Sequence, residues 1–183
     1  MSDGKRTPQI LELVEQFSEL LYRYAYRLTG NRADAEDLTQ QTFLRAQEKI
    51  HQLREVSTVK WWLCSIVRNS FLTSRRHAGV VQSLDAMNAV GRLDDSLCLR
   101  EAPEAVIDSE ELQRALLELS EEFRSPLILY YFEEFSYQEI AEQMGLPMGT
   151  VMSRLSRAKA FLRRRLSEES NAELPRDRVK VAT

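Results

Sequence analysis

The chain has 183 residues, of which 43% are hydrophobic and 29% charged, a composition that excludes disordered and fibrous proteins. Its two cysteines show neither a metal-ligand spacing nor a disulfide framework, and no apolar run reaches the roughly 18 residues of a membrane span. His51 and His77 form no acid–base or metal constellation. We therefore expect a cytoplasmic protein that is not an enzyme, is not inserted in a membrane, and has no metal or cofactor.

The formal net charge of −3 conceals a segregation of charge along the chain. Residues 1–76 hold 12 basic and 9 acidic groups, and residues 148–183 hold 9 and 4. Between them, residues 77–111 hold 2 basic and 8 acidic groups, and residues 112–147 hold 2 and 7. Two basic segments separated by an acidic one are suited to binding a polyanion at two places.

Three amphipathic helices are predicted over residues 10–77, after an N-terminal tail of residues 1–9. Apolar residues recur every three or four positions from Ile10 to Leu28, and the following Thr29-Gly30 ends the first helix. Asn31 is the predicted N-cap of the second helix, and Ser57 or Thr58 that of the third. We expect the three helices to form one compact bundle.

The helical pattern is lost over residues 78–107, where acidic residues accumulate, and this segment is predicted to be a flexible acidic linker. Asp108 is the predicted N-cap with which helical order resumes. Pro126 is expected near the start of a further helix, running from about Leu127 to Glu133.

A helix-turn-helix is predicted from the capping box Ser136 to Glu139, a turn at Gly145, and the basic helix that follows. It completes a second small domain over residues 108–166, followed by a polar C-terminal tail, 167–183, that is predicted to be disordered. The expected fold class is thus all-α, with two small helical domains joined by the linker.

The second helix of such a motif presents its first turns to base edges in the major groove. Candidates for contact with duplex DNA are Met148, Thr150, Met152, Ser153, Arg154, Ser156 and Arg157. Arg124, placed before Pro126, is expected to touch the DNA backbone from a helix start.

The third predicted helix has a second face, opposite its core stripe, that carries Trp61, Arg68 and Asn69. Aromatic stacking combined with amide hydrogen bonds suits the capture of an unpaired base. The alternative is that Trp61 packs against the first helix.

Three segments together resemble an RNA polymerase sigma factor of the extracytoplasmic-function type, group 4 of the sigma-70 family. They are DAEDLTQQTFLRA at 34–46, WLCSIVRN at 62–69, and the run from Leu127 through SYQEIA at 136–141 to GTVMSRL at 149–155. The chain departs from the family at Met152, where Lys or Arg is usual, and at Ser156, where several members carry a larger or more basic residue.

The resemblance implies a role for each domain. Residues 10–77 would be sigma region 2, which docks on the polymerase clamp helices through Asp34, Asp37, Gln40, Gln41 and Phe43. The same region would bind the melted minus-10 element, with Asn69 holding a flipped-out base and Lys49, Leu53, Trp61, Ser65, Arg68, Arg75 and Arg76 around it. Residues 108–166 would be sigma region 4, which reads the minus-35 element and lies near the polymerase flap.

The expected function is that of a transcription initiation factor. It would direct core RNA polymerase to minus-10/minus-35 promoters, binding both duplex and melted single-stranded DNA, and would assist melting by capturing unstacked bases. An anti-sigma factor is the expected restraining partner. A free-standing helix-turn-helix regulator and a helical protein-interaction module remain alternatives, and the regulator would bind a palindromic duplex without polymerase.

Overall fold

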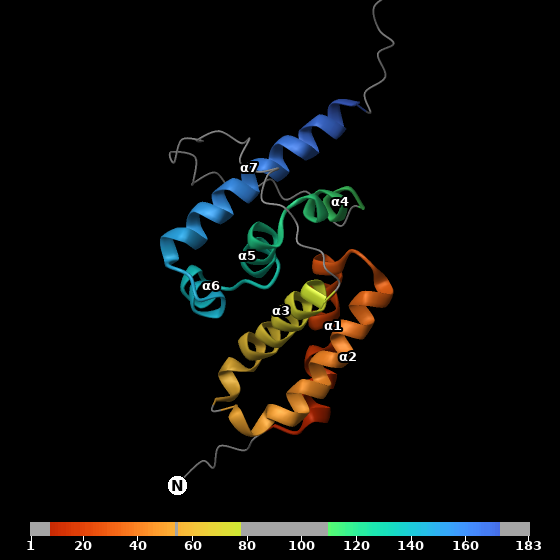
Figure 1. The fold of residues 1–183 in the computed structure, drawn as a ribbon, viewed down its shortest axis with the longest axis vertical. Coiled ribbons are helices and arrows are strands. Elements are labelled where there is room, and N and C mark those ends of the chain that lie inside the picture. The colour runs from red at the N-terminus through yellow and green to blue at the C-terminus, as the bar shows by residue number, and fades with distance from the viewer. Residues whose placement is uncertain (1–7, 54, 78–109, 173–183) are drawn as a thin grey trace, which may run out of the picture.

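The computed structural model describes residues 8–53, 55–77 and 110–172, excluding the side chains of residue 77 and residues 168–172. Within these ranges the chain is helical, without a strand, which confirms the all-α prediction (Figure 1). The predicted linker, the cap at Asp108 and most of the predicted tail lie outside the described residues.

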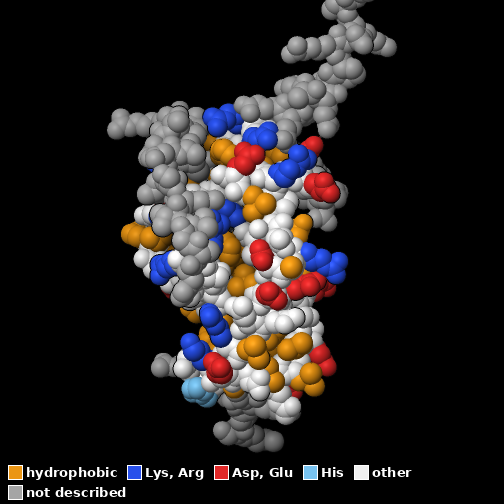
Figure 2. All heavy atoms as spheres, turned by 45° about the vertical axis from the view of Figure 1, so that its right-hand side comes forward, with side chains coloured by type: hydrophobic (Ala, Val, Ile, Leu, Met, Phe, Trp, Pro, Cys, Tyr) orange, Lys and Arg blue, Asp and Glu red, His pale blue; other side chains and the backbone are white. Residues whose placement is uncertain are grey.

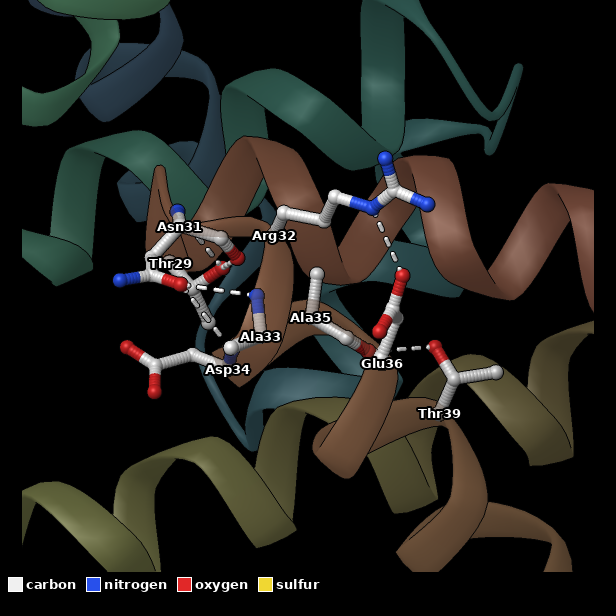
Figure 3. A network of polar contacts seen from close by, with 8 residues as sticks. All are labelled: Thr29, Asn31, Arg32, Ala33, Asp34, Ala35, Glu36 and Thr39. Atoms are coloured by element: carbon white, nitrogen blue, oxygen red, sulfur yellow. Dashed lines mark hydrogen bonds and ion pairs between the residues drawn. The ribbon is translucent and has the colours of Figure 1, made fainter.

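The N-terminal bundle consists of α1 (Ile10–Thr29), α2 (Arg32–Lys49) and α3 (Val59–His77), with two 3₁₀ turns, Ile50–Gln52 and Val56–Thr58, before α3. Gly30 ends α1 in the left-handed region, at φ 69°, and its N–H donates to Tyr26 O at 2.8 Å. Asn31 caps α2 because its side chain accepts hydrogen bonds from the N–H groups of Ala33 and Asp34 (Figure 3). Both predicted boundaries are confirmed. The side of α3 that faces the bundle is buried and includes Leu63, Val67 and Phe71.

The C-terminal unit consists of α4 (Glu110–Glu118), α5 (Glu121–Tyr131), α6 (Tyr137–Met144) and α7 (Met148–Ala172). The α6–α7 pair is the predicted helix-turn-helix. Ser136 and Glu139 form the capping box, and Gly145 adopts φ 64° at the turn. Helix α7 buries Val151 and Leu155 and continues six residues past the predicted end at 166.

The prediction for the helix that contains Pro126 was wrong. Helix α5 begins at Glu121, so the proline is its sixth residue rather than one of its first. A proline has no N–H to donate to the carbonyl four residues earlier, and here that carbonyl belongs to Glu122. A side chain from α7 approaches this carbonyl to 3.5 Å, as described below.

The two units pack against each other (Figure 1). Buried side chains from both belong to one apolar cluster, which includes Leu28 of α1 and Leu116 of α4. At the edge of this contact Gln113 Nε2 donates to Tyr26 O at 3.1 Å, and the guanidinium of Arg27 lies 4.1 Å from the ring centre of Phe132. The described residues therefore form a single closed arrangement of the two domains.

Candidate functional site

The predicted docking surface lies on the outer face of α2. Asp34, Asp37, Gln40 and Gln41 are exposed, whereas Phe43 is half-buried and packs against the core. The Asp34 carboxylate points away from the cap network, in contrast to Glu36, which pairs with Arg32 at 2.8 Å (Figure 3). On the face shown in Figure 2, acidic side chains gather at mid-height with hydrophobic ones below them. This face of α2 is open to a partner.

The residues predicted to bind the minus-10 strand divide into an open and a covered set. Lys49, Asn69 and Arg76 are exposed, while Leu53, Trp61, Ser65, Arg68 and Arg75 are half-buried. All lie on α3 or on the end of α2 and the turn that follows it. The structure thus brings the predicted residues to one side of the bundle, but a second element covers part of that side.

The covering element is the C-terminal unit. Trp61 Nε1 donates to Glu139 O at 3.1 Å, so this indole neither stands free in solvent nor packs on α1 alone. Arg68 Nη2 lies 3.2 Å from Glu121 Oε1, and the Arg68 side chain is only 12% exposed. This face of α3 therefore has one backbone carbonyl and one carboxylate of the C-terminal unit as its present partners.

A cleft of about 520 Å³ lies between the two units beside these contacts. Leu53, Trp61 and Trp62 line it from the bundle, and Glu133 and Glu139 from the C-terminal unit. Its walls are acidic on one side and aromatic on the other.

Glu133 is the most buried carboxyl group at this cleft, with 4% exposure. Its Oε2 lies 3.9 Å from Lys60 Nζ, which also donates to the Glu133 carbonyl. Burial raises the pKa of Glu133 to about 7, against the opposing effect of Lys60, Arg27 and Arg23 and with a small addition from Glu134. This carboxyl group therefore titrates close to neutral pH.

Arg124 occupies a different place from the one expected of a DNA contact. It is 1% exposed, and its guanidinium donates to Leu28 O at 2.6 Å, Leu119 O at 2.8 Å and Leu117 O at 3.3 Å. Burial lowers the pKa of Arg124 to about 10, with a further reduction from Arg75, so the group stays charged at neutral pH. In this arrangement Arg124 ties the α4–α5 turn to the end of α1 and does not face solvent.

The predicted minus-35 residues lie along the outer face of α7. Met152, Ser153 and Arg157 are exposed, and Thr150, Arg154 and Ser156 are half-buried. Arg154 turns inward, since its Nη2 lies 3.0 Å from Glu122 Oε2 and its Nη1 donates to Glu122 O at 3.5 Å. That carbonyl is the one that Pro126 leaves without an intrahelical donor.

Sequence reasoning missed the acidic partners Glu121, Glu122 and Glu133. For Glu122 a signal existed, because a proline inside a helix marks the carbonyl four residues before it as free. For Glu121 and Glu133 the sequence carried none, since their partners lie on a different domain.

Within the described ranges, no group of three or more His, Cys, Asp or Glu residues could hold a metal ion. No described helix combines the length and the apolar character that crossing a membrane requires.

Comparison with known proteins identifies both units. Residues 13–80 match the family described as Sigma-70 region 2, and residues 109–162 match Sigma-70, region 4. The chain is 38% identical over 174 residues to the ECF RNA polymerase sigma factor SigE of Mycolicibacterium smegmatis, covering 92% of this chain and 66% of SigE. It is 34% identical over 161 residues to SigL of Mycobacterium tuberculosis, covering 85% of this chain and 88% of SigL.

Among solved structures, the chain resembles the sigma factor RpoE of Bartonella quintana, solved in complex with the anti-sigma factor NepR. The TM-score is 0.68 at 29% identity, over 86% of this chain and 96% of that one. CnrH, solved with the cytosolic domain of CnrY, shares the fold with a TM-score of 0.58 at 19% identity, over 90% and 88% of the two chains. The chain therefore belongs to the extracytoplasmic-function RNA polymerase sigma factors of the sigma-70 family, which are transcription initiation factors rather than enzymes.

Proposed function

We propose that this chain joins core RNA polymerase through α2, reads a minus-35 duplex with α7, and assists melting by capturing minus-10 bases on α3. The observation that carries the proposal is the presence of sigma regions 2 and 4 in one chain, each with its predicted DNA-facing helix. The docking residues would be Asp34, Asp37, Gln40 and Gln41, with the exposed edge of Phe43, against the clamp helices. The Leu127–Tyr131 segment would approach the flap.

Base capture would centre on Asn69, whose exposed amide can donate to and accept from the edge of a base. Lys49, Leu53, Ser65, Arg75 and Arg76 would surround the displaced strand. Trp61 and Arg68 would join them once released from Glu139 and Glu121. Binding energy from these contacts would offset the few kcal/mol that unstacking costs.

Use of this face requires the two units to separate, because α3 cannot hold a DNA strand and the C-terminal unit on the same side chains. The 32 residues between α3 and α4 are enough chain to connect separated units. We further propose an anti-sigma factor as a partner that favours the closed arrangement, by analogy with RpoE and its NepR complex.

The test is run-off transcription by core polymerase and the full chain on a random promoter library. The chain should select templates that share two spaced elements. On a selected promoter Asn69→Ala should slow initiation from the duplex and have little effect on a template already melted at minus 10. Gln47→Ala, which removes an exposed amide of α2 outside the proposed surfaces, serves as the matched control.

Equal loss on both templates would rule out base capture. Protection of a palindromic duplex by the chain alone, without any redirection of polymerase, would instead favour a free-standing regulator.

A further inference from the structure

Two large apolar side chains stand in solvent at the start of α7. Met148 is 53% exposed and Met152 is 45% exposed. Residues four apart on a helix lie on the same face, one turn apart, so the two methionines form one apolar strip. Val151 and Leu155 are buried beside this strip, and both methionines lie in the N-terminal turns of α7, the end of the second helix that a helix-turn-helix presents to the major groove.

Two of the polar side chains expected to read bases from these turns are already engaged within the C-terminal unit. Arg154 is held by the carboxylate and the carbonyl of Glu122. The Ser153 hydroxyl donates to Thr150 O at 3.1 Å, within its own helix. Among the side chains exposed on the first turns of α7, the two methionines are therefore the large ones, beside Gly149 and Ser153.

Apolar surface has one partner in the major groove, the C5 methyl group of thymine. A methionine is unbranched and polarisable, so it can adjust its three rotatable bonds to cover such a methyl group. We propose that Met148 and Met152 read thymine methyl groups of the minus-35 element, and that this chain selects those positions by methyl contact. The inference rests on the proposed function and specifies how its α7 chooses a sequence.

Charge on α7 favours DNA over a protein as the occupant of this strip. Arg157, Arg163 and Arg164 are exposed farther along the same helix, where they are placed to hold phosphates. An apolar tip followed by basic turns matches a groove floor with methyl groups between two phosphate walls.

The experiment uses the full chain with core polymerase and a promoter selected from the random library. Each thymine of its minus-35 element is replaced in turn by deoxyuridine, which removes the methyl group and leaves every hydrogen-bonding group in place. We expect one or two positions at which initiation at sub-saturating polymerase falls about fourfold. The same replacement in the spacer is the template control.

The variants connect the effect to the side chains. Met148→Ala and Met152→Ala should each abolish the response to deoxyuridine at one position, while Met152→Leu should keep it. Leu11→Ala removes an exposed apolar side chain on α1 and should retain the full wild-type response.

Three outcomes would overturn the inference. Equal initiation from thymine and deoxyuridine at every minus-35 position would show that no methyl group is read. A uniform loss in both alanine variants, with the deoxyuridine response unchanged, would make the strip a protein contact instead. Failure of the chain to redirect polymerase to any promoter would overturn both this inference and the proposed function.

Discussion

Arg124 shows how one side chain can serve the fold where its residue type points to DNA. Its guanidinium satisfies carbonyls from two helices of different domains. Each buried carbonyl left without a donor costs about 1 to 3 kcal/mol of folding free energy. Relaxation of the surrounding structure recovers part of this cost. Its position in the structure therefore makes Arg124 a determinant of stability.

We expect Arg124→Met to lower the free energy of unfolding by about 2 to 4 kcal/mol, because the aliphatic stem is kept and the donors are lost. Chemical denaturation of the full chain measures this change. Arg157→Met, on the exposed face of α7, should stay within about 0.5 kcal/mol of wild type. Unchanged stability of Arg124→Met together with weaker minus-35 binding would return Arg124 to the DNA surface.

Glu133 gives the molecule a pH dependence with a definite sign. Its pKa in the fold is about 7, above the usual 4.5, so the folded state binds this proton more tightly than the unfolded chain. The associated stability is complete below pH 4.5 and is lost as pH rises through about 7. Lys60 from α3 and Arg23 and Arg27 from α1 oppose the shift without reversing it.

We expect wild type to lose about 2 to 3 kcal/mol of unfolding free energy across that window relative to Glu133→Gln. Denaturation curves of both proteins between pH 4.5 and 8 give the difference directly, because groups common to both cancel. A difference that stays constant with pH would show that Glu133 titrates as an ordinary surface carboxyl.

At the scale of elements, helix ends are set by local chemistry. Ser136 and Glu139 satisfy each other's backbone N–H groups at the start of α6. Ser136→Ala should therefore reduce the free energy of unfolding by about 1 kcal/mol. Ser153→Ala is the matched control, because that hydroxyl only bonds its own helix and its loss should change stability little. Equal effects of the two substitutions would contradict the cap.

The same locality explains which elements the sequence could predict. Gly30, Asn31, Ser136 and Gly145 bound their helices as expected, since a cap depends on residues within one turn. The α5 boundary was wrong because a proline is most often a first-turn residue, whereas Pro126 lies inside the helix and the carbonyl it leaves free faces Arg154, from a helix distant in sequence.

From the sequence, the candidate site could be predicted only as groups of residues that share one side of a helix. Periodicity placed Trp61, Arg68 and Asn69 on one side of α3, and the structure agrees. It could not predict that Glu121 and Glu139 would cover two of them. Those contacts join side chains to groups on another domain, and they follow no repeat along the chain.

At the scale of the whole molecule, the closed arrangement can be tested through two glycines with nearly the same backbone. Gly30 and Gly145 have φ of 69° and 64°, so an alanine at either pays the same left-handed strain, about 1 kcal/mol. A Cβ at Gly145 meets no atom within 4 Å, whereas a Cβ at Gly30 would lie 2.2 Å from Leu117 Cδ1 of the C-terminal unit. The difference in unfolding free energy between the two alanine variants therefore measures the effect of the contact with Leu117 across the domain interface.

We expect Gly30→Ala to destabilise the chain more than Gly145→Ala, and Leu117→Ala to remove that excess in the double variant. Equilibrium unfolding of wild type, Gly30→Ala, Leu117→Ala and the double variant gives a double-mutant cycle, and Gly145→Ala is measured beside them. Identical costs at the two glycines would mean that the domains do not touch at this point in solution.

Opening can be tested through the ion pair that covers α3. We expect Glu121→Gln to raise the affinity of the free chain for a single-stranded minus-10 oligonucleotide several-fold, because Arg68 loses its charged partner. Fluorescence anisotropy measures the change. Glu118→Gln breaks the 3.0 Å pair with Arg165 inside the C-terminal unit and should not affect binding. A similar gain in both variants would indicate a general loss of negative charge as the cause.

The pairing of Arg68 with Glu121 has a consequence for ionic strength. In the proposed function Arg68 has two competing anions, the Glu121 carboxylate when the domains are closed and a DNA phosphate when they are apart. Dissolved ions weaken both attractions. A bound strand makes contacts to several phosphates, whereas the Arg68–Glu121 pair is a single contact, so salt weakens strand binding more than it weakens the pair. Unaided oligonucleotide binding should therefore weaken steadily as salt is added, but less steeply than in Glu121→Gln, because loosening of the Arg68–Glu121 pair offsets part of the loss in the wild-type chain.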